Sequence, residues 1–286
     1  MKLFYLFLFL VITDALSLVP VFSAARGRSQ SRTLHMKTLV VFGGSGATGR
    51  EVVYQALQQG HKVVTLARTP SKMLVPARVS ISGDQPLVDQ KLRVVQGDVT
   101  SATDVDKCFA AAEDEVVGVV VALGGKTKDV GPTMLTDGTK NIISSLSKLQ
   151  QGKRIAVVTS IGAGDSERQA PLMFKALMYT VMKSIFNDKN SQEQLFTSPD
   201  GPGKGLEFTI VRPGGLGIGP PTGVINVIDG EAGSIQRADV ASFCLGAVFD
   251  KDFPYLRKTP CISSSLGVSW KKQPEIAGFD KVKTAN

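Results

Sequence analysis

The stretch KTLVVFGGSGATGREVVYQALQQGHKVVTLAR, Lys37 to Arg68, combines two apolar runs with a glycine-rich turn and a helix-like segment. Thr38–Phe42 and Lys62–Leu66 are rich in apolar and β-branched residues, which predicts two buried β-strands. The residues between them, Ala47–Gln59, predict a helix that ends at Gly60. A strand, a glycine turn and a helix in this order indicate the start of a dinucleotide-binding unit.

The glycines of this stretch form a G-x-x-G-x-x-G pattern at Gly43, Gly46 and Gly49. Without a Cβ, Gly43 can make the tight turn, and Gly46 lets the backbone approach a pyrophosphate. Gly49 would let the helix pack close to the strand. Backbone N–H groups and the dipole at the helix start favour phosphate. The pattern therefore predicts a dinucleotide site, with a purely structural glycine turn as the alternative.

The end of the second predicted strand distinguishes between the nicotinamide cofactors. NAD(H) sites usually carry Asp or Glu here to bind the ribose hydroxyls, whereas a 2′-phosphate requires a cation. This strand ends in TLARTPSK, which contains Arg68 and Lys72 but no acid. Because a guanidinium pairs well with phosphate, the sequence predicts NADP(H) rather than NAD(H). The alternative is that Arg68 is a solvated surface residue.

Residues that follow the next two predicted strands are expected beside the cofactor. Asp98 follows the strand Leu92–Val95, where its carboxylate can accept a hydrogen bond from adenine or instead cap a turn. Leu123, Gly124 and Gly125 follow the apolar strand Val116–Val121, and small residues there would let the backbone pass the cofactor.

Strands and helices alternate through the remaining chain, with no internal repeat. Further helices are expected at 105–112, 132–149, 171–186 and 238–249, and further strands at 154–158, 208–211 and 259–263. Apolar strands separated by helices indicate a parallel sheet covered on both faces. The predicted fold class is α/β, a Rossmann-like doubly wound parallel sheet in one domain, 37–270, with a small C-terminal substrate-side region. Residues 271–286 are expected to form a C-terminal tail.

The first 36 residues have the composition of a targeting leader. Lys2 precedes an apolar run, Leu3–Ile12, that is shorter than the roughly 20 residues needed to span a bilayer. Small residues follow, and then a stretch with Arg and Ser but no acid, which is typical of a transit peptide. The tandem is similar to bipartite plastid leaders. We therefore expect residues 1–36 to engage membrane translocation machinery and direct the protein to a plastid, with the secretory pathway or endoplasmic reticulum as the alternative.

Composition argues against two other classes of protein. The chain has 286 residues and a net charge of +8, but no basic run after the leader is longer than Lys271-Lys272. Nucleic-acid binding is therefore not expected. Three scattered cysteines and two histidines indicate neither a metal site nor a Ser-His-Asp triad. The oligomeric state stays open.

Several short motifs occur in a characteristic order between Lys37 and Leu266: VVFGGSGATG, LAR, GDV, VALGG, TKNI, VVTSIGAG and FTIVRPGGL. Together they resemble the atypical short-chain dehydrogenase/reductases of the NAD(P)H-binding, NmrA-like type, which include biliverdin-IXβ and flavin reductases. The resemblance covers most of the chain. It implies that the cofactor contacts Gly43, Ser45, Gly46, Ala47, Thr48, Gly49, Arg68, Asp98, Val99, Leu123, Gly124, Thr159, Pro213, Gly214 and Gly215.

Two arrangements of catalytic residues are consistent with the resemblance. Tyr179 and Lys183 form a Y-x-x-x-K pair; on one continuous helix they share a face, and the lysine would help the tyrosine donate a proton, with Ser160 nearby. Alternatively, that apolar helix is core, and Lys189 occupies the position of a functional residue in the family.

The function that follows from these features is that of an NADPH-dependent oxidoreductase. It would transfer hydride to a planar conjugated acceptor (a flavin, a quinone or an open-chain tetrapyrrole), and Ser160 would orient the acceptor or donate a proton. The alternative is a non-catalytic NADP(H)-binding redox sensor or assembly protein of the NmrA-like type. A sugar-nucleotide epimerase would require a larger substrate domain than the chain provides.

Overall fold

The computed structural model describes residues 37–80, 82, 84–125, 130–150, 152–264 and 268–269. The expected leader (1–36), the expected tail (271–286) and the Lys271-Lys272 run lie outside the described residues. The domain bounds of 37–270 therefore stay a prediction. Within the described ranges, no helix is both long and apolar enough to cross a membrane.

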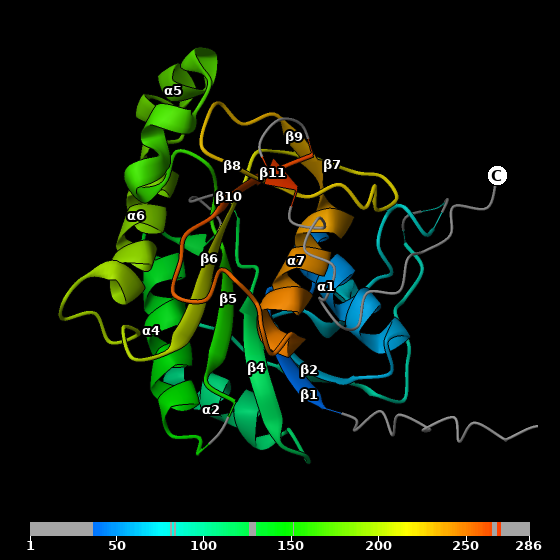
Figure 1. The fold of residues 1–286 in the computed structure, drawn as a ribbon. Coiled ribbons are helices and arrows are strands. Elements are labelled where there is room, and N and C mark those ends of the chain that lie inside the picture. Colours follow the sequence, from blue (N-terminus) through cyan, green and yellow to red (C-terminus); the bar gives the residue numbers. More distant parts are fainter. Residues whose placement is uncertain are drawn as a thin grey trace, which may run out of the picture. The chain divides into compact units, whose positions relative to one another are not determined.

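One nine-stranded sheet forms the centre of the fold, with the strand order β11-β8-β10-β6-β5-β4-β1-β2-β3 (Figure 1). Its strands are β1 (Thr38–Phe42), β2 (Lys62–Ala67), β3 (Leu92–Gln96), β4 (Val116–Val121), β5 (Arg154–Val158), β6 (Glu207–Pro213), β8 (Asn226–Ile228), β10 (Cys261–Ser263) and β11 (Val268–Ser269). β1 to β6 and β10 pair in parallel, and β8 is antiparallel to β10 and β11. A separate parallel pair joins β7 (Gly215–Gly217) to β9 (Ser234–Gln236).

This arrangement confirms the predicted fold class. The order β3-β2-β1-β4-β5-β6 is that of a doubly wound Rossmann sheet, in which the order of the strands across the sheet reverses between β1 and β4. Ligands of such sheets bind at the carboxyl ends of the strands, beside this reversal. The short strands β7, β8, β9 and β11, of two or three residues each, were not predicted.

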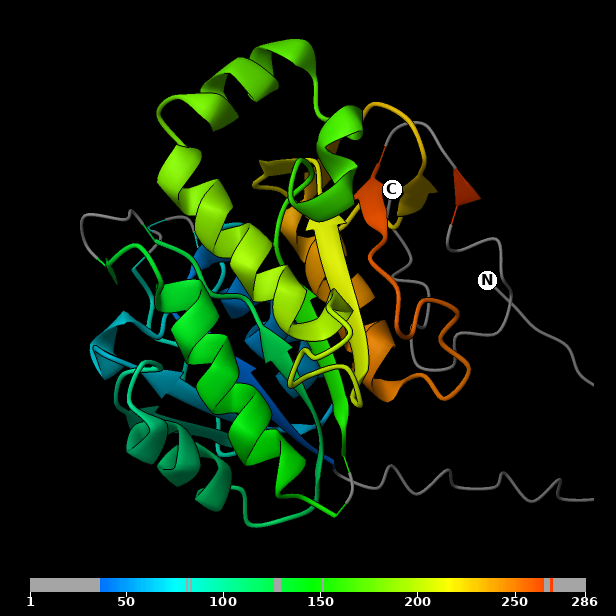
Figure 2. The ribbon, with the colours of Figure 1, turned by 90° about the vertical axis from the view of Figure 1, so that its left-hand side faces the viewer.

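Helices cover both faces of the sheet, as Figures 1 and 2 show. They are α1 (Ala47–Gln58), α2 (Ala102–Ala110), α4 (Met134–Ser147), α5 (Leu172–Tyr179), α6 (Lys183–Thr197) and α7 (Arg237–Phe249). Successive residues of β1 point to opposite faces: Leu39 and Val41 pack with α1 and α7, and Val40 and Phe42 pack with α2, α4 and α6. Two cores explain why the strand is apolar throughout rather than alternating.

The start of α4 differs from the prediction that placed it at Pro132. The helix begins at Met134, and its first N–H groups are capped by a residue of α6. The Asp188 carboxylate accepts hydrogen bonds from the backbone N–H groups of Leu135 (2.8 Å) and Thr136 (3.0 Å) and from the Thr136 hydroxyl (2.6 Å). Because the cap lies more than 50 residues along the chain, no local sequence signal marks this start.

The prediction of one continuous helix over 171–186 is wrong. α5 ends at Tyr179, and α6 begins at Lys183. Thr180 leaves the helical conformation (φ −111°, ψ −95°), and its hydroxyl donates to the carbonyl oxygen of Ala176 (2.8 Å). Consecutive β-branched residues, Thr180 and Val181, together with this side-chain bond, favour a break over another helical turn.

All three cysteines are free and buried. Burial raises the pKa of the Cys108 and Cys244 thiols to about 12, and it also raises the pKa of Cys261. Thiolate, the reactive form, is therefore scarce at all three positions near neutral pH.

Candidate cofactor and substrate site

A cavity of about 560 Å³ lies at the carboxyl ends of β1 to β5, where the strand order reverses. Its volume falls in the range of small-molecule sites. Twelve of the residues expected at the site line it: Gly43, Ser45, Gly46, Ala47, Thr48, Arg68, Asp98, Val99, Leu123, Gly124, Thr159 and Lys189. The sequence-predicted residues from five strand ends are thus brought together around one space.

The glycine turn after β1 has no room for side chains. Gly43 has a φ of +85°, and a Cβ added there would lie 2.3 Å from the carbonyl oxygen of Ala122. A Cβ on Gly49 would lie 2.0 Å from the carbonyl oxygen of Gly43. Gly49 itself does not line the cavity; it allows α1 to approach the turn. The close approach of backbone to backbone shapes the cradle expected for a pyrophosphate.

The first turn of α1 faces the same cavity. Gly46 is the N-cap, no side chain caps the helix, and no acidic residue lies in its first turn. Ala47 and Thr48, the first two helical residues, line the cavity with their N–H groups beyond reach of intrahelical partners. The positive end of this helix is therefore suited to an anion such as a phosphate.

Two charged residues, one after β2 and one after β3, line one end of the cavity. Arg68 follows β2, is exposed, and makes no ion pair with any residue that the structure describes. Asp98 follows β3 and caps a turn: its Oδ1 accepts hydrogen bonds from the backbone N–H of Thr100 (2.9 Å) and the Thr100 hydroxyl (2.7 Å). Asp98 therefore both caps this turn and lines the cavity, so the two roles predicted for it as alternatives are compatible.

Thr159 and Lys189 form the wall of the cavity at the end of β5. The ammonium group of Lys189 donates to the carbonyl oxygen of Thr159 (3.0 Å). Burial lowers the pKa of Lys189 to about 8, although the charges of Glu193 and Asp188 act in the opposite direction. A lysine with such a pKa can hold or release a proton near physiological pH.

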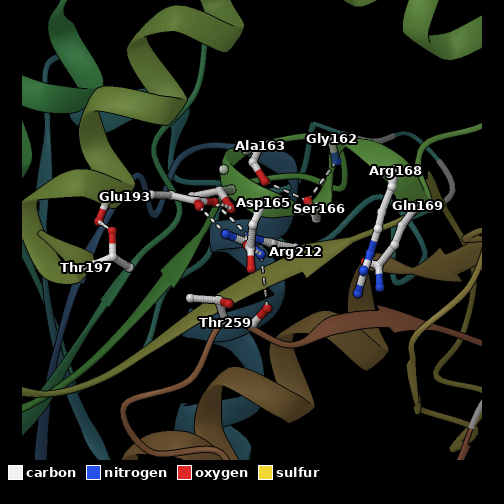
Figure 3. Close-up of polar contacts among 12 residues, drawn as sticks. Gly162, Ala163, Asp165, Ser166, Arg168, Gln169, Glu193, Thr197, Arg212 and Thr259 are labelled. Atoms are coloured by element: carbon white, nitrogen blue, oxygen red, sulfur yellow. Dashed lines mark hydrogen bonds and ion pairs between the residues drawn. The ribbon is translucent and has the colours of Figure 1, made fainter.

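Behind this wall lies a buried ion pair between Glu193 of α6 and Arg212 of β6 (Figure 3). Arg212 Nε donates to Glu193 Oε1 (3.1 Å), which also accepts from the Thr159 hydroxyl (2.7 Å). The Arg212 guanidinium also pairs with Asp165, whose side chain is largely exposed. Thr159, and through it the Lys189 contact, is thus fixed from behind by a charged network.

Four expected site residues near β6 lie elsewhere. Ser160 is half-buried and does not line the cavity; its hydroxyl donates to the carbonyl oxygen of Ile161 (3.0 Å). Pro213, Gly214 and Gly215 also lie off the cavity wall. A Cβ on Gly214 would lie 2.1 Å from the carbonyl oxygen of Gly233, so the packing of a neighbouring segment explains this glycine.

The predicted pairing of Tyr179 with Lys183 is also wrong. The break between α5 and α6 puts the two residues on different helices, and neither lines the cavity. Tyr179 is 58% exposed, and its hydroxyl donates to the Glu167 carboxylate, which raises the pKa of Tyr179. Lys183 is exposed at the start of α6. Of the four expected catalytic residues, Lys189 is the one on the cavity wall.

Sequence reasoning missed a part of the wall that follows β6. Leu216 of β7 and Arg237, the first residue of α7, both line the cavity, as does Met134 of α4. The sequence pattern predicts a helix from Ala238, whereas α7 begins one residue earlier, at Arg237. A basic residue beside a helix start at the carboxyl edge of the sheet was the available signal.

Comparison with known proteins identifies the family. A family model described as NAD(P)H-binding matches residues 43–251. The chain belongs to this NAD(P)H-binding family. The match spans the glycine turn, the strand ends around the cavity and α7, and it confirms the family predicted from the motifs.

Relatives of this NAD(P)H-binding protein include enzymes. An uncharacterized chloroplastic protein of Arabidopsis thaliana is 29% identical over 228 residues, which cover 76% of this chain and 73% of the relative. Reductase pytE of Aspergillus terreus is 26% identical over 200 residues, covering 62% of this chain and 74% of the relative. Among solved structures, ChuY, an anaerobillin reductase from Escherichia coli O157:H7, matches with a TM-score of 0.57 at 23% identity, covering 80% of this chain and 97% of that chain.

Family and relatives make the chain an NAD(P)H-dependent oxidoreductase that acts on a small molecule, as expected. Among the described residues, no cluster of three or more His, Cys, Asp or Glu side chains is arranged to hold a metal ion.

Proposed function

We propose that the protein is an NADPH-dependent reductase of a planar conjugated acceptor: a flavin, a quinone or an open-chain tetrapyrrole. The observation that carries the proposal is the single cavity in which the glycine turn, Arg68, Thr159 and Lys189 meet. A dinucleotide lying across the strand ends would have its adenosine near Arg68 and its nicotinamide near Thr159, as in other doubly wound sheets. The reductases among the relatives support the reaction class.

The cavity fits this cofactor by its own chemistry. The turn between Gly43 and Gly49 leaves space that a Cβ would fill, and the α1 N–H groups beside it would hold a pyrophosphate. Arg68, which has no partner carboxylate in the described part of the chain, would hold the 2′-phosphate. Bound NADPH supplies the hydride for the reaction.

Lys189 is the residue that we assign to proton transfer. Its ammonium group is oriented by the Thr159 carbonyl, and the residue lines the cavity where an acceptor would lie. The acceptor gains a hydride and a proton, so an ammonium with a pKa of about 8 can supply the proton and recover it from water. Thr159 positions this group and does not itself transfer a proton.

The pH dependence of turnover follows from this assignment. Because the protonated form is the donor, kcat is expected to fall as the pH rises through about 8 and to be constant below that value. Lys189→Met should lower kcat about tenfold at pH 7 and should remove the fall of kcat above pH 8. The expected loss is smaller than a general acid usually contributes, because a reduced flavin can also take its proton from water. Steady-state assays of both forms across the pH range measure this. An unchanged pH profile in Lys189→Met would contradict the role of Lys189.

The cofactor preference tests the role of Arg68. Arg68→Ala is expected to raise the Kd for NADPH about tenfold and to leave the Kd for NADH nearly unchanged, because the guanidinium contacts the 2′-phosphate alone. Isothermal titration with both cofactors gives the two values. Arg168→Ala, which removes an exposed arginine that does not line the cavity, is the matched control. Equal losses for NADPH and NADH would refute the assignment.

The acceptor class is tested by following NADPH absorbance with full-length protein and a panel of FMN, menadione and biliverdin. Oxidation of NADPH with at least one of them is expected. The non-catalytic redox sensor is the second candidate, and the location of Tyr179 and Lys183 away from the cavity favours it. Tight NADPH binding without oxidation across the panel would support the sensor instead of the reductase.

We also propose that the protein works in a plastid. The chloroplastic relative and the composition of residues 1–36 support this location. A fusion of residues 1–36 to a fluorescent protein tests it, and retention of the fusion in the secretory pathway would favour the alternative.

A further inference from the structure

Arg237 is a cationic residue on the cavity wall, and the cofactor binding proposed above gives it no role. Its side chain is half-buried, and its Nη1 donates to the carbonyl oxygens of Leu216 and Gly217 (3.1 Å each). These two bonds fix the guanidinium against β7. Nε and Nη2 have no hydrogen-bond partner among the described residues, and neither is fully buried. They are therefore free to donate to a ligand.

No carboxylate neutralises this guanidinium within the described ranges of the chain. The acid nearest to it along α7, Asp239, is occupied: its oxygens accept from the backbone N–H groups of Thr222 (3.0 Å) and Gly223 (2.9 Å) and from the Thr222 hydroxyl (2.7 Å). Arg237 is also the first residue of α7, where the helix dipole disfavours a cation. Protein stability therefore does not explain the charge, whereas an anionic ligand in the cavity would.

The strand order indicates which ligand this is. Arg68 and Asp98 follow β2 and β3, on one side of the reversal, whereas Thr159 and the β7 segment follow β5 and β6, on the other side. A dinucleotide with its adenosine at β2 and its nicotinamide at β5 has its phosphates at the glycine turn between them. Arg237, held against β7 by its bonds to Leu216 and Gly217, belongs to the segment that follows β6, on the side of the reversal where the nicotinamide and the acceptor are expected.

We propose that Arg237 binds an oxyanion, a carboxylate or a phosphate, on the acceptor, so that the preferred acceptors of this reductase are anionic planar molecules. The proposal rests on the reductase function proposed above. Leu216 lies beside the guanidinium on the cavity wall and is 38% exposed, so it offers an apolar surface to the conjugated body of the same molecule. Arg237 is thus a specificity-determining residue that contacts the substrate and takes no part in proton transfer.

Matched acceptor pairs test this proposal by binding, without the need for turnover. FMN and riboflavin share the isoalloxazine ring and differ in one phosphate; biliverdin and its dimethyl ester differ in the charge of two carboxylates. Each is titrated into full-length protein saturated with NADP⁺, with binding followed by flavin fluorescence or by equilibrium dialysis. The anionic member of at least one pair is expected to bind about tenfold more tightly than its neutral partner. A preference within the FMN pair alone identifies phosphate as the oxyanion, and a preference within the biliverdin pair alone identifies carboxylate.

Arg237→Gln should abolish this preference and leave the affinity for the neutral members and for NADP⁺ unchanged. Glutamine keeps an N–H donor for the carbonyl groups of Leu216 and Gly217, and Arg237→Lys, which keeps the charge, should retain part of the preference. Arg93→Gln removes an exposed arginine at the start of β3 and is the control for net charge. Thermal unfolding and NADP⁺ binding verify that each variant is folded.

Two results would overturn the proposal. Equal affinities within both pairs for the unaltered protein would mean that Arg237 binds no acceptor anion. A loss of NADP⁺ affinity in Arg237→Gln would assign the arginine to the cofactor instead. Selective binding of the anionic members with no oxidation of NADPH would preserve the role of Arg237 and refute the reductase, so the two proposals fail in distinguishable ways.

Discussion

Replacing Arg212 by Met is expected to lower the free energy of unfolding by about 3–5 kcal/mol. The side chains of Arg212 and Glu193 are only 4% and 3% exposed, so the variant leaves the Glu193 carboxylate buried without its cation. In a domain of this size such a loss lowers the Tm by roughly 6–20 °C. Thermal and urea unfolding of the unaltered protein and the variant measure the change.

Two further variants separate the buried pair from surface charge effects. Asp165→Asn removes the exposed partner of Arg212, whose side chain is 86% exposed, and should change stability by no more than about 1 kcal/mol. The double variant Arg212→Met/Glu193→Leu removes both buried charges and should recover much of the lost stability. If Arg212→Met cost no more than Asp165→Asn, the pair would not be the fixed support of the Thr159 wall that its geometry indicates.

Gly49→Ala is expected to raise the Kd for NADPH about 100-fold while the domain stays folded. The added Cβ would lie 2.0 Å from the carbonyl oxygen of Gly43, so either α1 or the turn must move. Movement of about 1 Å misaligns the N–H groups of the cradle from the phosphates, and weakening two charge-assisted hydrogen bonds costs roughly 2–3 kcal/mol. Titration of both forms with NADPH gives the ratio of Kd values.

The control for this variant is Gly205→Ala, since no heavy atom lies within 4 Å of a Cβ added at Gly205. That change should leave both cofactor affinity and unfolding unaltered. An unchanged NADPH affinity in Gly49→Ala, with Gly205→Ala behaving as expected, would show that close packing of α1 on the turn does not shape the phosphate site.

The half of the site nearest the start of the chain was predictable because its signals are local. The glycine turn, the helix after it and Arg68 lie within 32 consecutive residues, and a strand-turn-helix unit has few alternative geometries. Their spacing alone placed them around one cavity. Asp98 and Gly124 were predictable for a related reason, since each lies within three residues of the end of a parallel strand whose carboxyl end is at the same edge.

The other half depends on contacts between distant residues. Thr159 is held by Glu193, 34 positions further along, and Arg212 reaches the same carboxylate from another strand. The Y-x-x-x-K spacing of Tyr179 and Lys183 has meaning only on an unbroken helix, and the bond from Thr180 to Ala176 accompanies the break. Arg237 lines the cavity because β9 pairs with β7, a contact between two three-residue strands that no periodicity announces. Such tertiary contacts are invisible to local patterns.

The burial of all three cysteines bears on how the protein responds to oxidising and reducing conditions. With thiol pKa values of about 12 for Cys108 and Cys244, and Cys261 also buried, the folded domain presents no cysteine sulfur for disulfide exchange or peroxide attack. On the proposed route to a plastid, an oxidising lumen and a reducing stroma would therefore leave the three thiols in the same state. In the proposed plastid location, illumination or oxidative stress would act on this protein through the supply of reduced nicotinamide cofactor, and not through a cysteine thiol switch of its own.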